Sequence, residues 1–530
     1  MIRRLEAQTL ALLQKLEKGF NHLFGEDQNP WYQLGALSFY FYWIVVITGL
    51  YLFIFFDTSI NGAFESMEAL THHQWYAGGI ARSLHRYASE AMAITVSLHM
   101  LREFSLGRFR AARWFSWFSG IPLLWLLFAS AIGGYWLVWD QFAQYIAETT
   151  SEWFGWLPPI GDSLARNFIS NQTLSDRFFS LLVFLHIALP LFLLLGMFIH
   201  IKRIKMPRTS PPKTLARLTL LAFLVLSLIK PAISMNKADM STVVSSINLD
   251  WIYMNVYPLL DILGFGQVWA LLVGFSFLAA ILPWLSPDKK IISKAAEVNP
   301  ANCNGCSWCF QDCPFEAITM VEHEYKKGHR QAQVDPDLCT ACGICAGSCP
   351  SATPFRNVEE LVSGIEIPDF SLDHLRDETR QKIESLSGHQ GILVFGCDHA
   401  LDINSIEDDQ TAVISLPCSG LLPPSFADYV SRQPQVSGVI VSGCSGENCY
   451  FRKGSEWTEQ RFNSERMPHL RTKAGQQKVK LLWANKGEER ALQEGISQYR
   501  SELAAAISNQ DDTISTHVQA VTEPEEKQYD

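Results

Sequence analysis

The stretch ARSLHRYASEAMAITVSLHMLREF, residues 81–104, carries two histidines fourteen residues apart. A second apolar stretch, RFFSLLVFLHIALPLFLLLGMFIH at residues 177–200, repeats this interval. Fourteen residues are nearly four helical turns, so the two imidazoles of each stretch share one helix face at heights about 21 Å apart. An ionisable side chain inside a membrane is costly and marks a functional site by default. The stretches therefore predict two facing pairs, His85 with His186 and His99 with His200.

Glycines repeat the same interval on the apolar stretches that precede these histidines, at Gly35 and Gly49 and again at Gly120 and Gly134. A macrocycle wedged into a four-helix bundle needs the flanking backbones to come close, and glycine removes the Cβ that would stand in the way. Taken singly, such a histidine more often hydrogen-bonds a neighbour, and such a glycine simply packs two helices. The joint pattern predicts two haems.

Six stretches are long enough to cross about 30 Å of hydrocarbon, which takes about 20 helical residues. They lie at about 33–56, 85–104, 114–139, 178–199, 214–236 and 266–285, and the second and fifth contain ionisable residues. Lysine and arginine gather at the N-terminus and after the second, fourth and sixth stretches, which predicts that both termini are cytoplasmic. The first histidine of each stretch then lies near the outer side, and the second lies near the cytoplasmic side.

Composition separates the chain into two halves. The 530 residues carry a formal net charge of −10, with 48% hydrophobic and 18% charged residues. The acidic excess falls in the second half, and all 12 cysteines lie at or after Cys303. This composition excludes a disordered protein and a nucleic-acid binder that needs a basic face. A membrane half followed by a soluble half that holds every thiol remains.

Eight cysteines form two copies of one motif. The first reads Cys303-x-x-Cys306-x-x-Cys309-x-x-x-Cys313-Pro, and the second reads Cys339-x-x-Cys342-x-x-Cys345-x-x-x-Cys349-Pro. This spacing fits the bacterial two-cluster ferredoxin, in which the fourth cysteine of each run ligates the other cluster. Zinc is the alternative for Cys-x-x-Cys, but the duplicated spacing disfavours it, and a cytoplasmic location disfavours disulfides. The predicted 4Fe-4S ligand sets are Cys303, Cys306, Cys309 and Cys349, and Cys339, Cys342, Cys345 and Cys313.

The remaining cysteines are Cys397, Cys418, Cys444 and Cys449, and they follow three strand-like runs, GILVFGCDHA, TAVISLPCSG and GVIVSGCSGENCYF. Strands that alternate with helices predict a parallel α/β domain. Thiols at strand ends then gather on one edge of the sheet, where ligands bind. Any one of these cysteines could be buried and structural, but all four together favour a third cluster.

From Asn29 to Leu285 the chain resembles the cytochrome b of quinol-oxidising respiratory and photosynthetic complexes. The likeness runs through both histidine stretches, GGYWLVWDQ (133–141) and LDWIYMNVYPLLDILG (249–264). It implies two b haems on the histidine pairs above, with Arg82 and Arg86 near haem propionates. Gln33 stands where some members attach a further haem to a cysteine, so a third haem is not expected.

Two residues are candidates for quinone contact by the same resemblance. The family's outer quinol motif Pro-Glu-Trp-Tyr reads Leu249-Asp250-Trp251-Ile252 here, so Asp250 keeps a carboxylate in an altered pocket. Lys213 lies where the family often has a basic residue that contacts quinone on the inner side. The alternatives are an interfacial acid for Asp250 and a topological lysine for Lys213.

Residues about 390–500 resemble the iron-sulfur delta subunit of methyl-viologen-reducing hydrogenases. The likeness lies in PCSG (417–420), GCSGENCYFRKG (443–454), Arg461 and Arg466. It implies a 2Fe-2S cluster on Cys397, Cys418, Cys444 and Cys449. The family passes electrons to heterodisulfide-reductase-type flavoproteins, which suggests the kind of partner.

The predicted fold is therefore multidomain: an all-α six-helix transmembrane bundle, an α+β two-cluster ferredoxin and an α/β iron-sulfur domain. The predicted segments are an amphipathic surface helix at 1–30, a di-haem membrane domain at 31–286, the ferredoxin at 295–355, a connecting segment with helical character at 356–388, the 2Fe-2S domain at 389–507 and a disordered acidic tail at 508–530.

The chain shows no nucleotide-binding glycine loop after a strand, no hydrolytic triad and no phosphate loop. It is therefore predicted to be an electron-transfer oxidoreductase subunit in the inner membrane of a bacterium or archaeon. It would link a cytoplasmic flavoprotein dehydrogenase, or a heterodisulfide-reductase-like subunit, to membrane quinone. A homodimer is plausible, and no nucleic-acid partner is expected. The alternatives are a membrane anchor or redox sensor for a soluble complex, and reverse flow from quinol to a low-potential cytoplasmic acceptor.

We expect the purified chain to hold two low-spin b haems that acidified acetone extracts completely, because the membrane half has no cysteine for covalent attachment. A pyridine haemochrome assay before and after extraction measures this. His99→Ala or His200→Ala should remove the inner haem and leave the outer one at least partly loaded. A single haem, or haem that resists extraction, would contradict the pairing.

Overall fold

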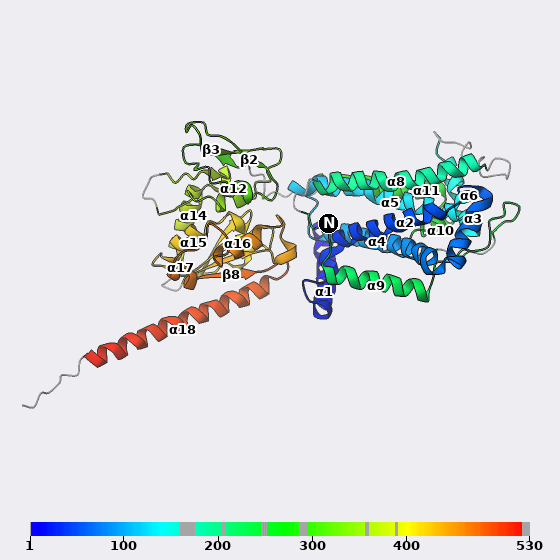
Figure 1. Cartoon of the computed structure of the whole chain (residues 1–530). Coiled ribbons are helices and arrows are strands. Elements are labelled where there is room, and N and C mark those ends of the chain that lie inside the picture. Colours follow the sequence, from blue (N-terminus) through cyan, green and yellow to red (C-terminus); the bar gives the residue numbers. More distant parts are fainter. Residues whose placement is uncertain are drawn as a thin grey trace, which may run out of the picture. The chain divides into compact units, whose positions relative to one another are not determined.

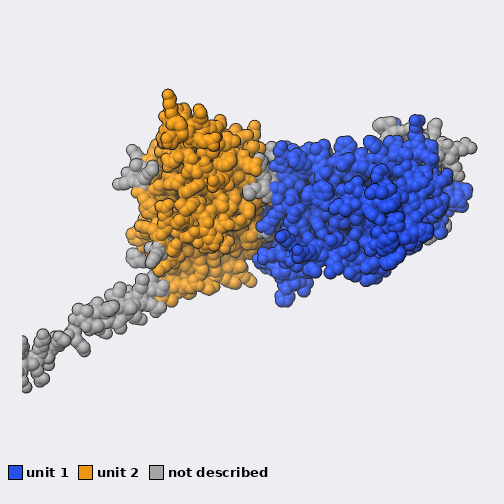
Figure 2. Space-filling model, in the orientation of Figure 1, with its two compact units in different colours: residues 1–288 blue, residues 289–530 orange. Residues whose placement is uncertain are grey.

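Helices make up the N-terminal half of the chain, and strands mixed with helices make up the rest (Figure 1). The computed structural model describes residues 2–158, 175–202, 207–244, 247, 250, 252–285, 294–355, 360–386 and 391–521. Two compact units, Met1–Asp288 and Lys289–Asp530, are coloured separately in Figure 2.

The first unit is helical. Its helices are α1 (Ile2–Phe24), α2 (Leu34–Phe55), α3 (Ile60–Glu68), α4 (Ile80–Ser105), α5 (Trp114–Val138), α6 (Gln141–Gly155), α8 (Asp176–Lys202), α9 (Lys213–Ile229), α10 (Val256–Leu263) and α11 (Phe265–Leu285). Helices α2, α4, α5 and α8 run alongside one another and share one buried core (Figure 1). Among the described residues, four stretches are long and apolar enough to cross a membrane: Pro30–Phe55, Ala111–Val138, Asp176–Lys202 and Phe265–Leu285. These stretches support an integral membrane protein.

The two remaining predicted spans are helices as well. The span predicted at 85–104 lies within α4, which carries charged residues toward both ends. The span predicted at 214–236 is shorter than expected, since α9 ends at Ile229, two residues before Pro231, which lacks the N–H that a helix needs. The Tyr40 hydroxyl donates to the carbonyl of Ala216 at 3.2 Å near one end of α9, and the Tyr87 hydroxyl donates to the carbonyl of Lys230 just past the other end. Helix α9 thus runs along the bundle in the direction of α2, and the count of six spans stays a prediction.

Helix α1 presents a face with two glutamates to the protein. Glu6 and Glu17 are only 2% and 8% exposed. Glu17 accepts a hydrogen bond from Nε of Arg102, at the end of α4, at 2.7 Å, and Glu6 pairs with the guanidinium of Arg110. Buried carboxylates are stable only when paired. The helix predicted to lie on the membrane surface is therefore also bound to the bundle by ion pairs.

The first part of the second unit holds two short antiparallel sheets. Strand β1 (Glu297–Val298) pairs with β4 (Ile365–Glu366), and β2 (Ile318–Glu322) forms a hairpin with β3 (Arg330–Val334). Helices α12 (Trp308–Gln311) and α13 (Ile344–Gly347) lie inside the two cysteine motifs. Strand β4 falls in the stretch predicted to be a connecting segment, and its Ile365 is 1% exposed. This part of 356–388 therefore belongs to the core, because it supplies the partner of β1.

The second part of this unit is built on a four-stranded sheet with the order β6-β5-β7-β8, in which all paired strands are parallel, as the alternation of strands and helices predicted. The strands are β5 (Gly391–Cys397), β6 (Thr411–Leu416), β7 (Val436–Gly443) and β8 (Val479–Trp483), and the helices are α14 (Leu372–Glu384), α15 (Pro424–Ser431), α16 (Gly454–Phe462), α17 (Lys473–Lys478) and α18 (Glu489–Val521). Alternate residues of β5 enter two different buried clusters, Leu393 and Phe395 on one face and Ile392 and Val394 on the other. Both faces of the sheet are covered, which explains the continuous apolar run of β5.

The C-terminal helix is longer than expected. Helix α18 continues to Val521, whereas composition predicted a disordered tail from residue 508. The alanine-rich run SELAAAISNQ (501–510) has high helix propensity, which lets the helix continue into the acidic tail.

We predict that Glu17→Ala weakens the attachment of α1 by about 3 kcal/mol, because it removes the carboxylate to which Nε of the buried Arg102 donates. Limited trypsin digestion of the detergent-solubilised protein should then cleave faster after Lys15. Lys18→Ala, an exposed change one residue away, is the matched control. Equal cleavage rates in the Glu17 variant and the wild type would mean that the ion pair does not hold the helix.

Candidate functional site

The outer histidine pair is framed by two glycines. A Cβ built on Gly49 of α2 would lie 2.9 Å from Cε1 of His85 on α4, and one on Gly134 of α5 would lie 2.8 Å from Cε1 of His186 on α8. Real Cβ atoms do not approach this closely, so these positions need glycine. The two imidazole centroids are 6.3 Å apart. A metal held between two imidazoles by bonds of about 2 Å needs ring centres roughly 6 Å apart, so this pair fits one iron.

The inner pair repeats the arrangement with more room. A Cβ on Gly35 would lie 3.5 Å from Cε1 of His99, and one on Gly120 would lie 3.6 Å from Cε1 of His200. Nδ1 of His200 is 2.9 Å from the hydroxyl oxygen of Ser119. The structure thus brings each predicted glycine against one predicted histidine.

Hydrogen bonds orient the outer imidazoles. Nδ1 of His85 lies 3.0 Å from the carbonyl oxygen of Val45, and Nδ1 of His186 lies 3.0 Å from that of Ser130. A carbonyl can only accept, so Nδ1 carries the proton in both rings, and Nε2 is the nitrogen available to a metal. Close backbones and oriented imidazoles together fit a haem at each level.

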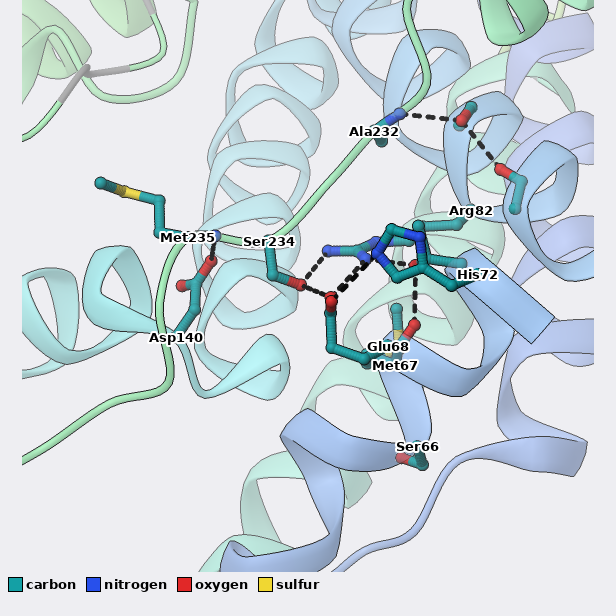
Figure 3. A network of polar contacts seen from close by, with 12 residues as sticks. Ser66, Met67, Glu68, His72, Arg82, Asp140, Ala232, Ser234 and Met235 are labelled. Atoms are coloured by element: carbon teal, nitrogen blue, oxygen red, sulfur yellow. Dashed lines mark hydrogen bonds and ion pairs between the residues drawn. The ribbon is translucent and has the colours of Figure 1, made fainter. Parts of the chain in front are cut away.

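Arg82 is held in a polar network near the outer end of α4 (Figure 3). Its guanidinium donates to the Thr71 hydroxyl at 2.5 Å and to the Ser234 hydroxyl at 2.8 Å. Ser234, on the segment after α9, donates in turn to Glu68 at 2.6 Å, and Glu68 also lies 3.6 Å from Arg82. The arginine is therefore already charge-paired within the protein, and its predicted contact with a propionate stays a prediction. Neither Glu68 nor Ser234 carries a sequence signal.

Asp250 lies in a second network beside the outer histidines. Its carboxylate accepts from the Tyr135 hydroxyl at 2.6 Å, and Tyr135 directly follows Gly134. Arg86 is 3.6 Å from the same carboxylate and bonds Glu90 at 2.8 Å. Sequence reasoning missed Tyr135 and Glu90, although the i,i+4 spacing of Arg86 and Glu90 on one helix was a usable signal.

The two quinone candidates do not meet. Lys213 is exposed at the first residue of α9, whose start is bonded to Tyr40 near the start of α2. Asp250 is instead buried beside Tyr135 and Arg86, toward the opposite end of the bundle. Leu249 and Trp251 of the predicted motif lie outside the described residues.

The ferredoxin-type cysteines line two cavities. One is lined by Cys303, Cys306, Cys309 and Cys349. The other is lined by Cys313, Cys339, Cys342 and Cys345. Each cavity takes three cysteines from one motif and one from the other, which is the crossed arrangement that the spacing predicted. Gly305 and Gly343, with φ of 65° and 77°, allow the loops to turn inside each motif.

Two buried thiols, one in each cavity, have a raised pKa. Burial raises the pKa of Cys309 to about 12, and neighbouring Cys349 adds to the shift. Burial likewise raises the pKa of Cys342 to about 12, with Cys313 and Cys339 adding to it. Thiolates packed this closely need a positive partner, which the iron of a cluster provides.

The last four cysteines gather at one edge of the parallel sheet. Cys397 ends β5, Cys418 follows β6, and Cys444 follows β7, so adjacent strands deliver three thiols. Cys449 shares a buried cluster with Cys397 and Cys444. A Cβ on Gly454 would lie 2.3 Å from Sγ of Cys418 and 3.5 Å from Sγ of Cys449. Glycine is needed here because the sulfurs occupy the space of a side chain.

This third cysteine site touches the second ferredoxin-type site. Cys342 and Cys418 belong to one buried cluster with Ile344 and Trp457. Beside them lies a buried ion cluster in which Asp312 accepts from both Arg461 and Arg466. Both arginines were noted only as part of a resemblance, and Asp312 was not singled out. Only the fold brings the aspartate to them.

Family models match three regions in order. Residues 21–207 match Cytochrome b/b6/petB, residues 302–353 match the 4Fe-4S dicluster domain, and residues 400–506 match Methyl-viologen-reducing hydrogenase, delta subunit. These matches, in this order along the chain, confirm the three resemblances. Cys397 lies just before the third match, so its membership of the site rests on geometry.

Curated relatives of the first region are cytochromes. Cytochrome b6 of Heliobacterium mobile is 29% identical over 185 residues, which are 35% of this chain and 86% of that protein. Cytochrome b of Rhodospirillum rubrum is 28% identical over 35% of this chain and 45% of its own length. A solved structure, Hyperthermophilic respiratory Complex III, is similar at 20% identity and a TM-score of 0.41, over 48% of this chain and 75% of that one. The family matches support a membrane electron-transfer subunit with haem b and 4Fe-4S clusters.

We predict that Gly134→Ala lowers haem content from two to about one per chain, because its Cβ would meet the His186 ring. Gly120→Ala, where the contact would be 3.6 Å, should lose less. Gly274→Ala on α11, where no atom lies within 4 Å of the added Cβ, is the control. A pyridine haemochrome assay on purified protein gives the haem count. Equal haem in all three variants would contradict the inference that glycine is required beside the histidines.

Proposed function

We propose that the chain carries electrons between a cytoplasmic flavoprotein dehydrogenase and the quinone pool, as the membrane subunit of an oxidoreductase. The observation that supports this most is the direct succession of the cysteine sites. Cys418 packs with Cys342, and Cys345 of the same site is an electrostatic neighbour of Cys309 in the next. Three adjoining cysteine sites suit an electron relay better than three independent sites with a purely structural role.

Two b haems, two 4Fe-4S clusters and one 2Fe-2S cluster would supply the one-electron carriers. The side chains of the protein would hold these carriers in place. The four histidines would hold the haems, and the twelve cysteines would hold the clusters in the sets described above. Eight of the twelve cysteines are buried, Cys303, Cys309, Cys342, Cys345 and the four C-terminal ones, which limits the access of water to the sites.

Electrons are proposed to enter the membrane region at the His99 and His200 level. Helix α11 ends beside the start of α5, since the rings of Trp284 and Trp114 are 5.6 Å apart. The chain therefore leaves the bundle on the side of Gly120, which is the inner level. Quinone would be reduced on this side, near Lys213.

The delta-subunit domain supports a docking role for a flavoprotein or a heterodisulfide-reductase-like subunit. The matching family model covers residues 400–506, which include three of the four C-terminal cysteines. We place the iron-sulfur domains in the cytoplasm of a bacterium or archaeon, since basic residues cluster on the inner loops. A homodimer is part of this proposal.

Quinol oxidation at the outer side is the second candidate. The burial of Asp250 among Tyr135 and Arg86 favours it, because a carboxylate bonded to a hydroxyl near the outer histidines could accept a proton from quinol. Electrons would then flow in reverse, toward a low-potential cytoplasmic acceptor.

We predict that the inner haem is reduced before the outer one when the clusters of membrane vesicles are reduced by a chemical donor. Stopped-flow spectra of both haems and extraction of quinone follow the order. Cys339→Ser should block both, since it removes a ligand from the middle of the relay, and Asp250→Asn should leave most quinone reduction intact.

Complete loss of quinone reduction in the Asp250 variant would move the chemistry to the outer side and favour the reverse direction. Haem reduction without any turnover of quinone would favour a membrane anchor or redox sensor instead.

A further inference from the structure

Arg461 is the largest side chain in the described structure that is completely buried, at 0% exposed. It comes from α16 and lies between the two cysteine sites that adjoin. Its Nη1 donates to the carbonyl of Gly420 at 3.0 Å, and its Nη2 donates to the carbonyl of Ile344 at 3.3 Å. Gly420 follows Cys418 by two residues, and Ile344 precedes Cys345. One guanidinium thus binds a loop of each site.

The charges around this guanidinium do not cancel. Asp312, which precedes Cys313, accepts from Arg461 through one oxygen and from Arg466 through the other. Arg466 also stacks on Trp457 at 4.5 Å, and Trp457 belongs to the buried cluster of Cys342 and Cys418. Two cations against one carboxylate leave one positive charge at the junction of the two sites.

A buried positive charge is costly, and burial lowers the pKa of Arg461 from its ordinary value. Its Nε is buried without a hydrogen-bond partner among the described residues. An unmet donor of this kind costs about 1–3 kcal/mol. Iron-sulfur clusters held by four thiolates are anionic, so they are the natural counter-charge, and the fold keeps the arginine where two of them would adjoin.

We propose that Arg461 is the positioning residue that raises the reduction potentials of the C-terminal site and of the second ferredoxin-type site, the two sites between which an electron passes in the proposed relay. The inference rests on the proposed function. In this step one electron leaves one site and enters the other, so that the first is oxidised and the second reduced, and no bond is made or broken. The added electron makes a site more negative, and a nearby fixed cation stabilises that state. The hydrogen bonds of the Arg461 guanidinium in the described structure go to Gly420, Ile344 and Asp312 and to none of Cys303, Cys306, Cys309 and Cys349. The site of these four cysteines therefore serves as an internal reference.

The test is an EPR-monitored redox titration of the full-length purified protein. Arg461→Gln should shift the potentials of both adjoining sites to more negative values and leave the reference site unchanged. Arg461→Lys, which keeps the charge, should recover most of the shift. Asp312→Asn, which removes the balancing negative charge, should shift the same two potentials in the positive direction. Arg380→Gln, which alters an exposed ion pair with Asp377 in the same unit, is the control.

The outcomes separate the inference from the function on which it rests. If the wild type shows no cluster signals, the proposed function fails. If the signals are present and Arg461→Gln leaves every potential unchanged, or shifts all three sites equally, the role of Arg461 is overturned. If Arg461→Gln does not fold, the opposite shift in Asp312→Asn decides, and unchanged potentials there also overturn the proposal. Iron content and melting temperature, measured on each variant, would reveal a purely structural role, in which the lysine and glutamine variants lose stability alike with no change in potential.

Discussion

The close approach of helix backbones to imidazole rings is the constraint on which the membrane unit depends. At the outer level the added Cβ of Gly49 or Gly134 would lie within 3 Å of a histidine carbon. Helix α2 must therefore pass close to α4, and α5 close to α8, which sets the four-helix core. The remaining helices fit around that core, with α9 bonded to α2 and α4 through tyrosine hydroxyls.

In the second unit, the exchange of the fourth cysteine between the two motifs fixes how the two loops are arranged. Cys349 lines the cavity of the first motif, and Cys313 lines that of the second, so neither loop can form its site alone. The parallel sheet then brings three thiols to one edge, where Cys418 packs against Cys342. The result is a series of adjoining sites rather than separate domains joined by a linker, and the strand of the supposed connecting segment completes the first sheet.

Three buried charges in the described structure are paired in the same way. Glu17 on α1, Arg82 on α4 and Asp312 beside a cysteine motif are all buried, and each has a partner of opposite charge. Such pairs contribute modestly to stability, but the loss of one partner is severe because it leaves a charge away from water. They therefore act mainly to hold segments in place, such as α1 on the bundle and the segment after α9 beside α4 (Figure 3). The two arginines around Asp312 differ, because one positive charge stays unbalanced there. This excess charge suggests that the adjoining cysteine sites supply the negative charge.

The sequence by itself determined what depends on local repetition. The helical period and the intervals of fourteen residues predicted that the histidines and glycines lie on matching helix faces. The ferredoxin spacing predicted which cysteines line each cavity, because three cysteines separated by only two residues each lie close together in a short loop. Tertiary structure alone decided the partners of charged groups, because these come from distant parts of the chain. Asp312 meets Arg461 across 149 residues, and Ser234 meets Arg82 across 152. No local pattern encodes such pairs, since they form only after apolar packing has brought the segments together.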